Sequence, residues 1–435
     1  MNNKKPETHN LQPGTLLQIF PIFAFMTTQQ RPNIYFFNPT CEYAVANGTT
    51  SWQPNRLLQK MEEDLGMLPL FLAKPHDIVL VKKLPTEKFL QKLKMQGISL
   101  PRFVLLEEAL KYKLNGEKLN RLMPWGWSPV AHKLLEPLKS SCSVPFQHSP
   151  VFKWQPGDRD LYSKKFGLQI LREMLPQLPP EKILPPSMLP EVVSNKREME
   201  TLIDRWGKLM VKAPWSSSGR GLQPITKTPV VPKVWEKLMG IVNDQGYAVA
   251  EPLLDKVMDM SLQFELKQGK VAFLGKRIFL TDKKGQYQGN FLKSKPADVS
   301  PEELQFAREL PHLLKKPHVK TIEASALAKN YEGFFGVDTL LFRDISGQLR
   351  VNPCLEINVR QNMGLLSLQL EKLLAPKSSG LFKTFYQKGK PFATFAREMQ
   401  SSHPLKLKDG KIESGFFALT EANDDALFGA YILAD

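Results

Sequence analysis

The feature that most limits the fold of this sequence is a change of pattern along the chain. In the first part, short apolar strands such as 34–37 and 78–81 alternate with helical segments such as 86–96, an order typical of an open α/β domain. From Leu209 onward, strands follow one another through glycine turns, as in the hairpin predicted at 261–280. The sequence therefore predicts an α/β domain followed by an α+β body.

The size and charge of the chain exclude several classes of protein. With 435 residues, of which 42% are hydrophobic and 23% charged, the chain can bury a large core and form several domains. Its net charge of +16 would attract polyanions such as nucleotides or nucleic acid. The basic residues are scattered, without Cys/His fingers or an RNP-like aromatic run, so we expect no dedicated nucleic-acid binding.

The N-terminus has the outline of a short signal peptide, because two lysines precede an apolar stretch at 16–25. Pro21 interrupts this stretch, and no cleavage site of small residues follows it. We therefore expect that Met26 is the true start and that residues 1–30 lie outside the fold. The three cysteines suit neither a disulfide framework nor a zinc site, and no other apolar stretch could span a membrane, which favours a cytoplasmic protein.

A loop of small residues follows the strand predicted at 209–212. Lys212 ends this strand, and Ser216 to Gly221 are serine, glycine and one arginine. Backbone N–H groups in such a loop can approach phosphate oxygens while the lysine supplies positive charge. The spacing differs from the Walker pattern, so a P-loop is not predicted. The alternative is a hairpin turn that binds nothing.

A second hairpin carries two carboxylates. Glu356 and Asn358 are two residues apart on a predicted strand and share a face, and Asp338 is the same distance from the turn near Gly347 as Glu356. The two carboxylates should therefore lie opposite each other. Oxygen donors of this kind suit Mg²⁺ shared with nucleotide phosphates. Arg360 continues the same face as a donor for phosphate or carboxylate, whereas a solvated polar face is the alternative.

Five segments, in content and order, resemble the ATP-grasp superfamily of carboxylate–amine ligases, which includes D-alanine:D-alanine ligase, biotin carboxylase and carbamoyl phosphate synthetase. The resemblance covers about residues 160–365. The segments are Lys212 with 216–221, 250–254, 259–262, 333–338 and 356–360.

The resemblance implies a three-domain architecture of an α/β N-terminal domain, a small lid domain with the glycine loop and a larger C-domain with the metal site. ATP would lie between the last two. We expect the domains at 31–155, 156–255 and 256–400, followed by a closing hairpin at 401–435.

The resemblance also assigns roles to individual residues. Lys212 and Arg360 are expected to act in catalysis. Lys165 is the alternative to Lys164 as the lysine at the start of the first lid helix. The residues expected to bind the nucleotide are Lys164, Lys212, Ser216, Ser217, Ser218, Gly219, Gly221, Glu251 at the adenine and Asp259 at the ribose.

Asp338, Glu356 and Asn358 are the expected ligands of Mg²⁺ or Mn²⁺. The sequence departs from the family in a longer hairpin, in Val359 where proline is common, and in Asp338 where glutamate is common. Neither substitution removes an oxygen donor. The N-terminal region matches no particular subfamily, and the sequence does not indicate an oligomeric state.

The function implied is an ATP- and Mg²⁺-dependent ligase, which activates a small-molecule carboxylate as an acyl phosphate for attack by an amine or another nucleophile. One alternative is a small-molecule kinase that phosphorylates an alcohol. Another is a nucleotide-binding protein without turnover, although such a protein would be expected to lose part of the metal set. The sequence does not specify the acceptor.

The loop predicted at 38–54 is the expected place for the acceptor. It leaves the carboxyl end of the first strand, which is where ligands bind in open α/β sheets. Asn38, Glu42 and Asn47 could contact the acceptor, with Gly48 allowing close backbone approach. The alternative is a surface loop whose Asn-Pro and Asn-Gly pairs only form turns.

Overall fold

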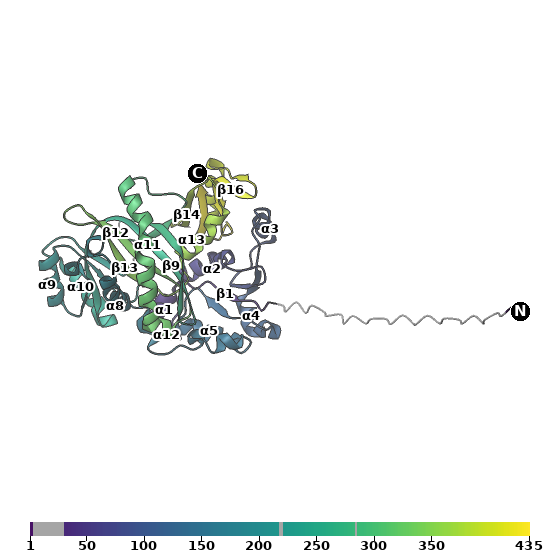
Figure 1. The fold of residues 1–435 in the computed structure, drawn as a ribbon, viewed down its shortest axis with the longest axis horizontal. Coiled ribbons are helices and arrows are strands. Elements are labelled where there is room, and N and C mark those ends of the chain that lie inside the picture. The colour runs from purple at the N-terminus through teal and green to yellow at the C-terminus, as the bar shows by residue number, and fades with distance from the viewer. Residues whose placement is uncertain (3–29, 217–220, 283–284) are drawn as a thin grey trace. The chain divides into compact units, whose positions relative to one another are not determined.

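The structure is a computed structural model that describes residues 1–2, 30–216, 221–282 and 285–435 (Figure 1). By its contacts the chain divides into Met1–Gln30 and a compact unit, Arg31–Asp435. The apolar stretch at 16–25 and Met26 lie outside the described residues, so the expected start remains a prediction. Among the described residues, no helix is both long and apolar enough to cross a membrane.

The first sheet of the compact unit is parallel and confirms the predicted α/β front. Its strand order is β3-β2-β1-β4, with helices between the strands. The bounds are β1 Ile34–Phe36, β2 Ile78–Val81, β3 Arg102–Leu105, β4 Leu122–Pro124, α1 Cys41–Asn47, α2 Arg56–Asp64, α3 Glu87–Met95, α4 Leu106–Tyr112 and α5 Pro129–Lys139. From the sequence, a threonine at the start of the helical segment 86–96 predicts an N-cap, and Thr86 does accept a hydrogen bond from Phe89 N.

The segment at 38–54 was predicted as a loop, which is wrong for its first half, because α1 lies within it. Cys41, Ala44 and Val45 are spaced for one helical face and are all buried. Gly48 ends the helix with a φ of 79° and donates its backbone N–H to the Ala44 carbonyl. The helix is only two turns long, so the turn residues on either side obscured its pattern.

The second sheet is small and antiparallel, with strand order β5-β8-β6-β7 and helices α9 and α10. Its apolar side chains form a core cluster of their own. Helix α8 precedes it and packs on the third sheet. The bounds are α8 Lys164–Met174, β5 Glu191–Val193, α9 Lys196–Trp206, β6 Leu209–Lys212, β7 Leu222–Ile225, α10 Pro232–Gln245 and β8 Ala248–Pro252.

Among the described residues, the third sheet has nine strands in the order β13-β12-β9-β10-β11-β14-β17-β16-β15. Its antiparallel hairpins confirm the predicted α+β body. The bounds are β9 Asp255–Lys267, β10 Lys270–Thr281, β11 Tyr287–Leu292, α11 Pro301–Ala324, α12 Ala326–Asn330, β12 Gly333–Arg343, β13 Leu349–Asn358, α13 Met363–Leu370, β14 Gly380–Tyr386, α14 Phe392–Ser402, β15 Lys406–Lys408, β16 Lys411–Ala418 and β17 Phe428–Ala434.

From the sequence, Ser300 as an N-cap and the two glutamates that follow it predict a helix over 301–314, but α11 continues to Ala324. It contains two interior prolines, each of which removes a backbone hydrogen bond. Its buried face, which includes Leu310, Leu314 and Ile322, continues past both prolines and packs against β10. Apolar burial therefore outweighs the local cost of proline.

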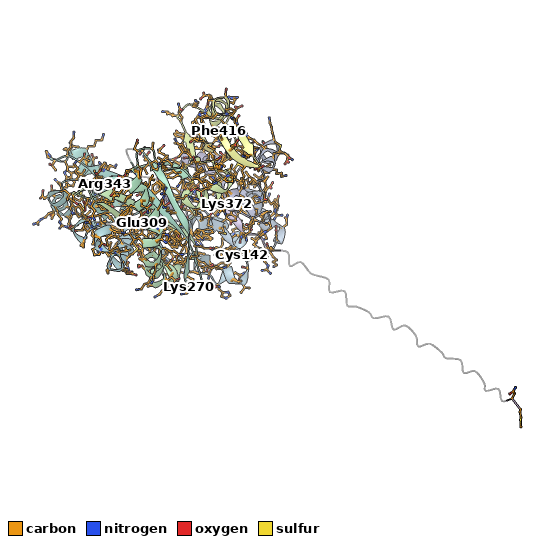
Figure 2. The ribbon with its side chains drawn as sticks, turned by 45° about the horizontal axis from the view of Figure 1, so that its top comes forward. Cys142, Lys270, Glu309, Arg343, Lys372 and Phe416 are labelled. Carbon is orange, nitrogen blue, oxygen red and sulfur yellow. The ribbon has the colours of Figure 1, made fainter. Side chains whose placement is uncertain are left out.

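The C-terminal strands pair as the expected hairpin, but they are an integral part of the large sheet. Strand β17 lies between β14 and β16. Figure 2 labels Phe416 of β16, a buried residue that packs against Tyr431. Ile432 belongs to the same core cluster as Phe37, which follows β1, so the C-terminal strand packs with the chain next to the first sheet.

Replacing Ile432 by alanine should lower the free energy of unfolding by about 2–5 kcal/mol, because Ile432 is fully buried. Urea denaturation followed by circular dichroism would measure this change. The matched control is Leu407→Ala on the edge strand β15 of the same sheet, where the side chain is 42% exposed and a loss of about 0.5 kcal/mol or less is expected. Equal losses in both variants would show that β17 is not a core strand.

Candidate active site

The carboxylates of the β12–β13 hairpin face each other. Asp338 is paired with Glu356, and Asn358 donates from Nδ2 to Asp338 Oδ2 at 3.0 Å. The register shifts between Asp338 and Leu340, whereas a regular ladder from Leu340–Asn352 would place Cys354 opposite Asp338. The geometry predicted for the two carboxylates is therefore present, and the irregular register produces it.

The two carboxylates differ in pKa. Burial, reinforced by the charge of Glu356, raises the pKa of Asp338 to about 7. Burial alone would also raise the pKa of Glu356, but the Lys164 and Lys212 ammonium groups and Arg360 hold it below its ordinary value. The pair therefore carries an ionised Glu356 and a carboxyl on Asp338 that retains its proton to near neutral pH.

The donors at this position fit a hard divalent cation. Two carboxylates and one amide oxygen are the ligands that Mg²⁺ and Mn²⁺ prefer. Among the described residues, no three His, Cys, Asp or Glu side chains form a metal group by themselves, so Asn358 would be needed to complete the set. Asn358 Oδ1 accepts from Arg360 Nη2 at 3.0 Å, so metal binding would have to displace this hydrogen bond.

Lys164 reaches the carboxylate pair from the start of α8. Its Nζ lies 2.8 Å from Glu356 Oε1 and 3.2 Å from the Ser216 carbonyl oxygen. Its backbone N–H donates to the Pro214 carbonyl at 3.0 Å, which fixes the beginning of the glycine loop. Lys165 is exposed and lies over the Tyr247 ring instead. The contacts therefore favour Lys164 over its neighbour.

Lys212 and Glu251 form a second buried ion pair, with Nζ and Oε1 2.6 Å apart. Strands β6 and β8 are neighbours, and Lys212 pairs with Val249, so Glu251 lies diagonally across on the same face. Burial raises the pKa of Glu251 although Lys212 opposes the shift. Glu251, expected at the adenine, is thus bound to the lysine expected at the phosphates.

Of the remaining residues expected to bind the nucleotide, the structure describes only some. Asp259 lies on β9, where its Oδ2 accepts from Lys256 and Thr281, each at 2.7 Å. Gly221 packs directly on Ser216, so a side chain at this glycine would collide with the loop base. Ser217, Ser218 and Gly219 lie outside the described residues.

The N-terminal sheet contributes Glu42 to this region. Glu42 is buried in the first turn of α1 and accepts from Arg360 Nε at 2.9 Å. Arg360 also donates from Nη2 to Asn358 and from Nη1 to the Gln361 carbonyl at 3.2 Å. The expected acceptor residue and the expected catalytic arginine are therefore in direct contact.

Asn38 and Asn47 are not brought to Arg360 by any contact of the described residues. Asn38 exchanges two hydrogen bonds with the Gly126 backbone, at 2.8 and 3.2 Å, and so holds the loop after β4. Asn47 is exposed at the end of α1 and accepts from Thr49 at 2.6 Å. Both side chains make local contacts, and their expected contacts with the acceptor remain predictions.

The sequence interpretation missed a buried polar cluster beside the carboxylates. Gln263 of β9 donates to Ser261 at 2.9 Å, and the Asn362 side chain caps α13. Gly336 and Gly364 lie against these side chains and have no space for a Cβ. The alternation of Asp259, Ser261 and Gln263 along one strand was the available signal.

A search of protein-family models finds no match to the chain, and a search of curated proteins finds none either. Several solved structures are similar in fold. N5-carboxyaminoimidazole synthetase from Staphylococcus aureus, complexed with ADP, is 14% identical, with 93% of each chain covered and a TM-score of 0.47.

Two further similar structures come from other organisms. A biotin carboxylase complex from Campylobacter jejuni is 11% identical, with a TM-score of 0.49. The match covers 94% of this chain and 88% of the biotin carboxylase chain. N5-carboxyaminoimidazole ribonucleotide synthetase from Thermus thermophilus is 13% identical, with 93% of each chain covered and a TM-score of 0.46. Likenesses at this level assign no activity to this chain.

Proposed function

We propose that this protein is an ATP- and Mg²⁺-dependent ligase of the ATP-grasp type, which activates a carboxylate as an acyl phosphate for attack by an amine. The observation that carries the proposal is a group of charged residues from three parts of the chain. It comprises Glu251 with Lys212, Lys164 with Glu356, and Asp338 linked through Asn358 and Arg360 to Glu42.

Each of the two lysines of this site forms an ion pair with a carboxylate, and the phosphates of a nucleotide could take the place of that carboxylate. Lys164 bonds Glu356, and Lys212 bonds Glu251, so phosphate oxygens would exchange with carboxylate oxygens as partners of the same cations. Charge interactions at partly buried positions are stronger than in water because screening is reduced. Lys164 and Lys212 would therefore hold the phosphates and stabilise charge on the transferred phosphoryl group.

Asp338, Glu356 and Asn358 would hold the metal, which would neutralise phosphate charge when bound. Release of Glu356 from Lys164 would free a carboxylate for the metal at the moment when Lys164 gains a phosphate. Arg360 would orient the activated carboxylate by its remaining N–H groups. Cys354 is buried, and burial raises the pKa of its thiol, so it is unsuited to act as a nucleophile.

The test is a screen for ADP release with carboxylates and amines, with hydroxylamine added to trap an acyl phosphate as a hydroxamate. We expect Mg²⁺-dependent ADP release and a hydroxamate of the matching mass, both lost with EDTA. A stable phosphoester without hydroxamate would support the kinase alternative. The absence of Mg²⁺-dependent nucleotide binding in calorimetry would contradict the proposal altogether.

A further inference from the structure

One oxygen of the buried Glu42 carboxylate has no hydrogen-bond partner among the described residues. Glu42 is 9% exposed, and its Oε2 is shielded from solvent. The other oxygen, Oε1, accepts from Arg360 Nε at 2.9 Å. A buried carboxylate oxygen without a donor is costly, so such atoms in native proteins call for an explanation.

The position of this oxygen is fixed. Glu42 is held through Arg360 to Asn358, and through Asn358 to Asp338, by three consecutive hydrogen bonds of 2.9, 3.0 and 3.0 Å. On the other side, Gly126 lies against both Cys41 and the Arg360 side chain. The Glu42 carboxylate is thus connected by hydrogen bonds to the carboxylates proposed to hold the metal.

A hydrogen-bond donor would satisfy Oε2, because a carboxylate oxygen offers lone pairs as acceptors. The donor must be small, since the oxygen is shielded from solvent. The guanidinium of Arg360 directs its hydrogen bonds to Glu42 Oε1, the Gln361 carbonyl and Asn358, so a donor from a bound molecule would complete the carboxylate. An amine head fulfils these conditions.

We infer that Glu42 Oε2 receives an N–H of the amine acceptor, an assignment that rests on the proposed ligase function. The amine nitrogen attacks the carbonyl carbon of the acyl phosphate and forms the C–N bond. The C–O bond to phosphate breaks, and inorganic phosphate leaves with the electron pair. The proton released by the nitrogen passes to Glu42 Oε2. Glu42 is thereby both the recognition group for the amine and its proton acceptor.

The binding test compares two cations of equal charge. Methylammonium carries three N–H donors, whereas tetramethylammonium carries none. We expect methylammonium chloride at about ten times its Kd to raise the Tm of the wild-type protein by about 1–2 °C relative to tetramethylammonium chloride at equal ionic strength. Glu42→Gln should abolish this difference, because the amide can present a donor in place of the free oxygen.

Glu62→Gln is the matched control. Glu62 is as deeply buried, but both of its oxygens are satisfied, by Thr40 Oγ1 at 2.5 Å and Lys82 Nζ at 3.0 Å. This variant should keep the full difference between the two salts. In the hydroxylamine assay, Glu42→Gln should raise the KM for hydroxylamine at least about tenfold and change MgATP affinity less than about threefold, which corresponds to the loss of one hydrogen bond to a charged group.

Equal Tm values of the wild-type protein in both salts, or a difference that persists in Glu42→Gln, would overturn the assignment. Neither measurement of Tm requires nucleotide, so this failure is separate from failure of the proposed function. Binding of methylammonium without any binding of MgATP would support the amine site at Glu42 Oε2 and contradict its role in a ligase. A parallel rise of the KM for hydroxylamine and the Kd for MgATP would show that Glu42 acts only by supporting the structure of the protein. That result would contradict its role in binding the amine.

Discussion

Glu356→Gln is expected to lower the rate of ADP release by about 10²–10³-fold while the protein remains folded. Glutamine keeps the length of the side chain and can still accept a hydrogen bond from Lys164. It loses the negative charge that holds Lys164 and that would bind the metal beside Asp338. Single-turnover measurement of ADP release at saturating Mg²⁺ would give the rate, and circular dichroism would check the fold.

The control for this variant lies on the same hairpin. Asp344 is a carboxylate at the opposite end, where it pairs with Arg350 Nε at 2.5 Å next to the turn. Asp344→Asn removes a charge from the hairpin without touching the proposed site, so ADP release should stay within about twofold of wild type. A rate loss of similar size in both variants would show that the hairpin matters for folding alone.

Lys212→Met should have two separate effects. The lysine is buried and paired with Glu251, so its removal leaves an uncompensated carboxylate and should cost about 3–5 kcal/mol of unfolding free energy. It should also weaken MgATP binding, because a cation proposed to hold phosphate is lost. Urea denaturation and isothermal calorimetry would measure the two effects independently.

The double variant Lys212→Met/Glu251→Gln separates these effects. It removes the unpaired charge, so much of the stability should return while MgATP binding stays weak. Recovery of both properties would mean that Lys212 acts only as the partner of Glu251. Failure to recover stability would mean that the aliphatic part of the lysine, rather than its charge, stabilises the sheet that contains β6 and β8.

The stability lost in Lys212→Met should also depend on pH. Burial already raises the pKa of Glu251 above its ordinary value, and loss of Lys212 removes the charge that opposes this shift. A carboxyl with a raised pKa binds more protons in the folded than in the unfolded protein, so stability falls as pH rises above the unfolded pKa. The single variant should therefore be closer to wild type at pH 5 than at pH 8.

Much of the local structure could be predicted from sequence. Strands at 78–81 and 209–212 agree with the structure because continuous apolar or β-branched runs and flanking turns define them. The caps at Thr86 and Ser300 agree because an N-cap requires only its own short segment. Interpretation failed at α1 and at the end of α11, where burial against distant segments outweighs local propensity.

The sequence by itself determined the chemistry available to this protein: two carboxylates and an amide on one hairpin, lysines at a strand end and at a helix start, and an arginine two residues beyond the amide. Their spacing is local, so the periodicity of a strand is sufficient to place them on one face.

Only the tertiary structure decided which charges meet. Lys164 and Glu356 are 192 residues apart, and Glu42 and Arg360 are 318 apart. No local pattern encodes such pairs, because Coulomb interactions depend on distance in space and on burial, which the packing of the sheets sets. The same packing leaves Glu42 Oε2 without a donor among the described residues, and so defines where an amine could bind.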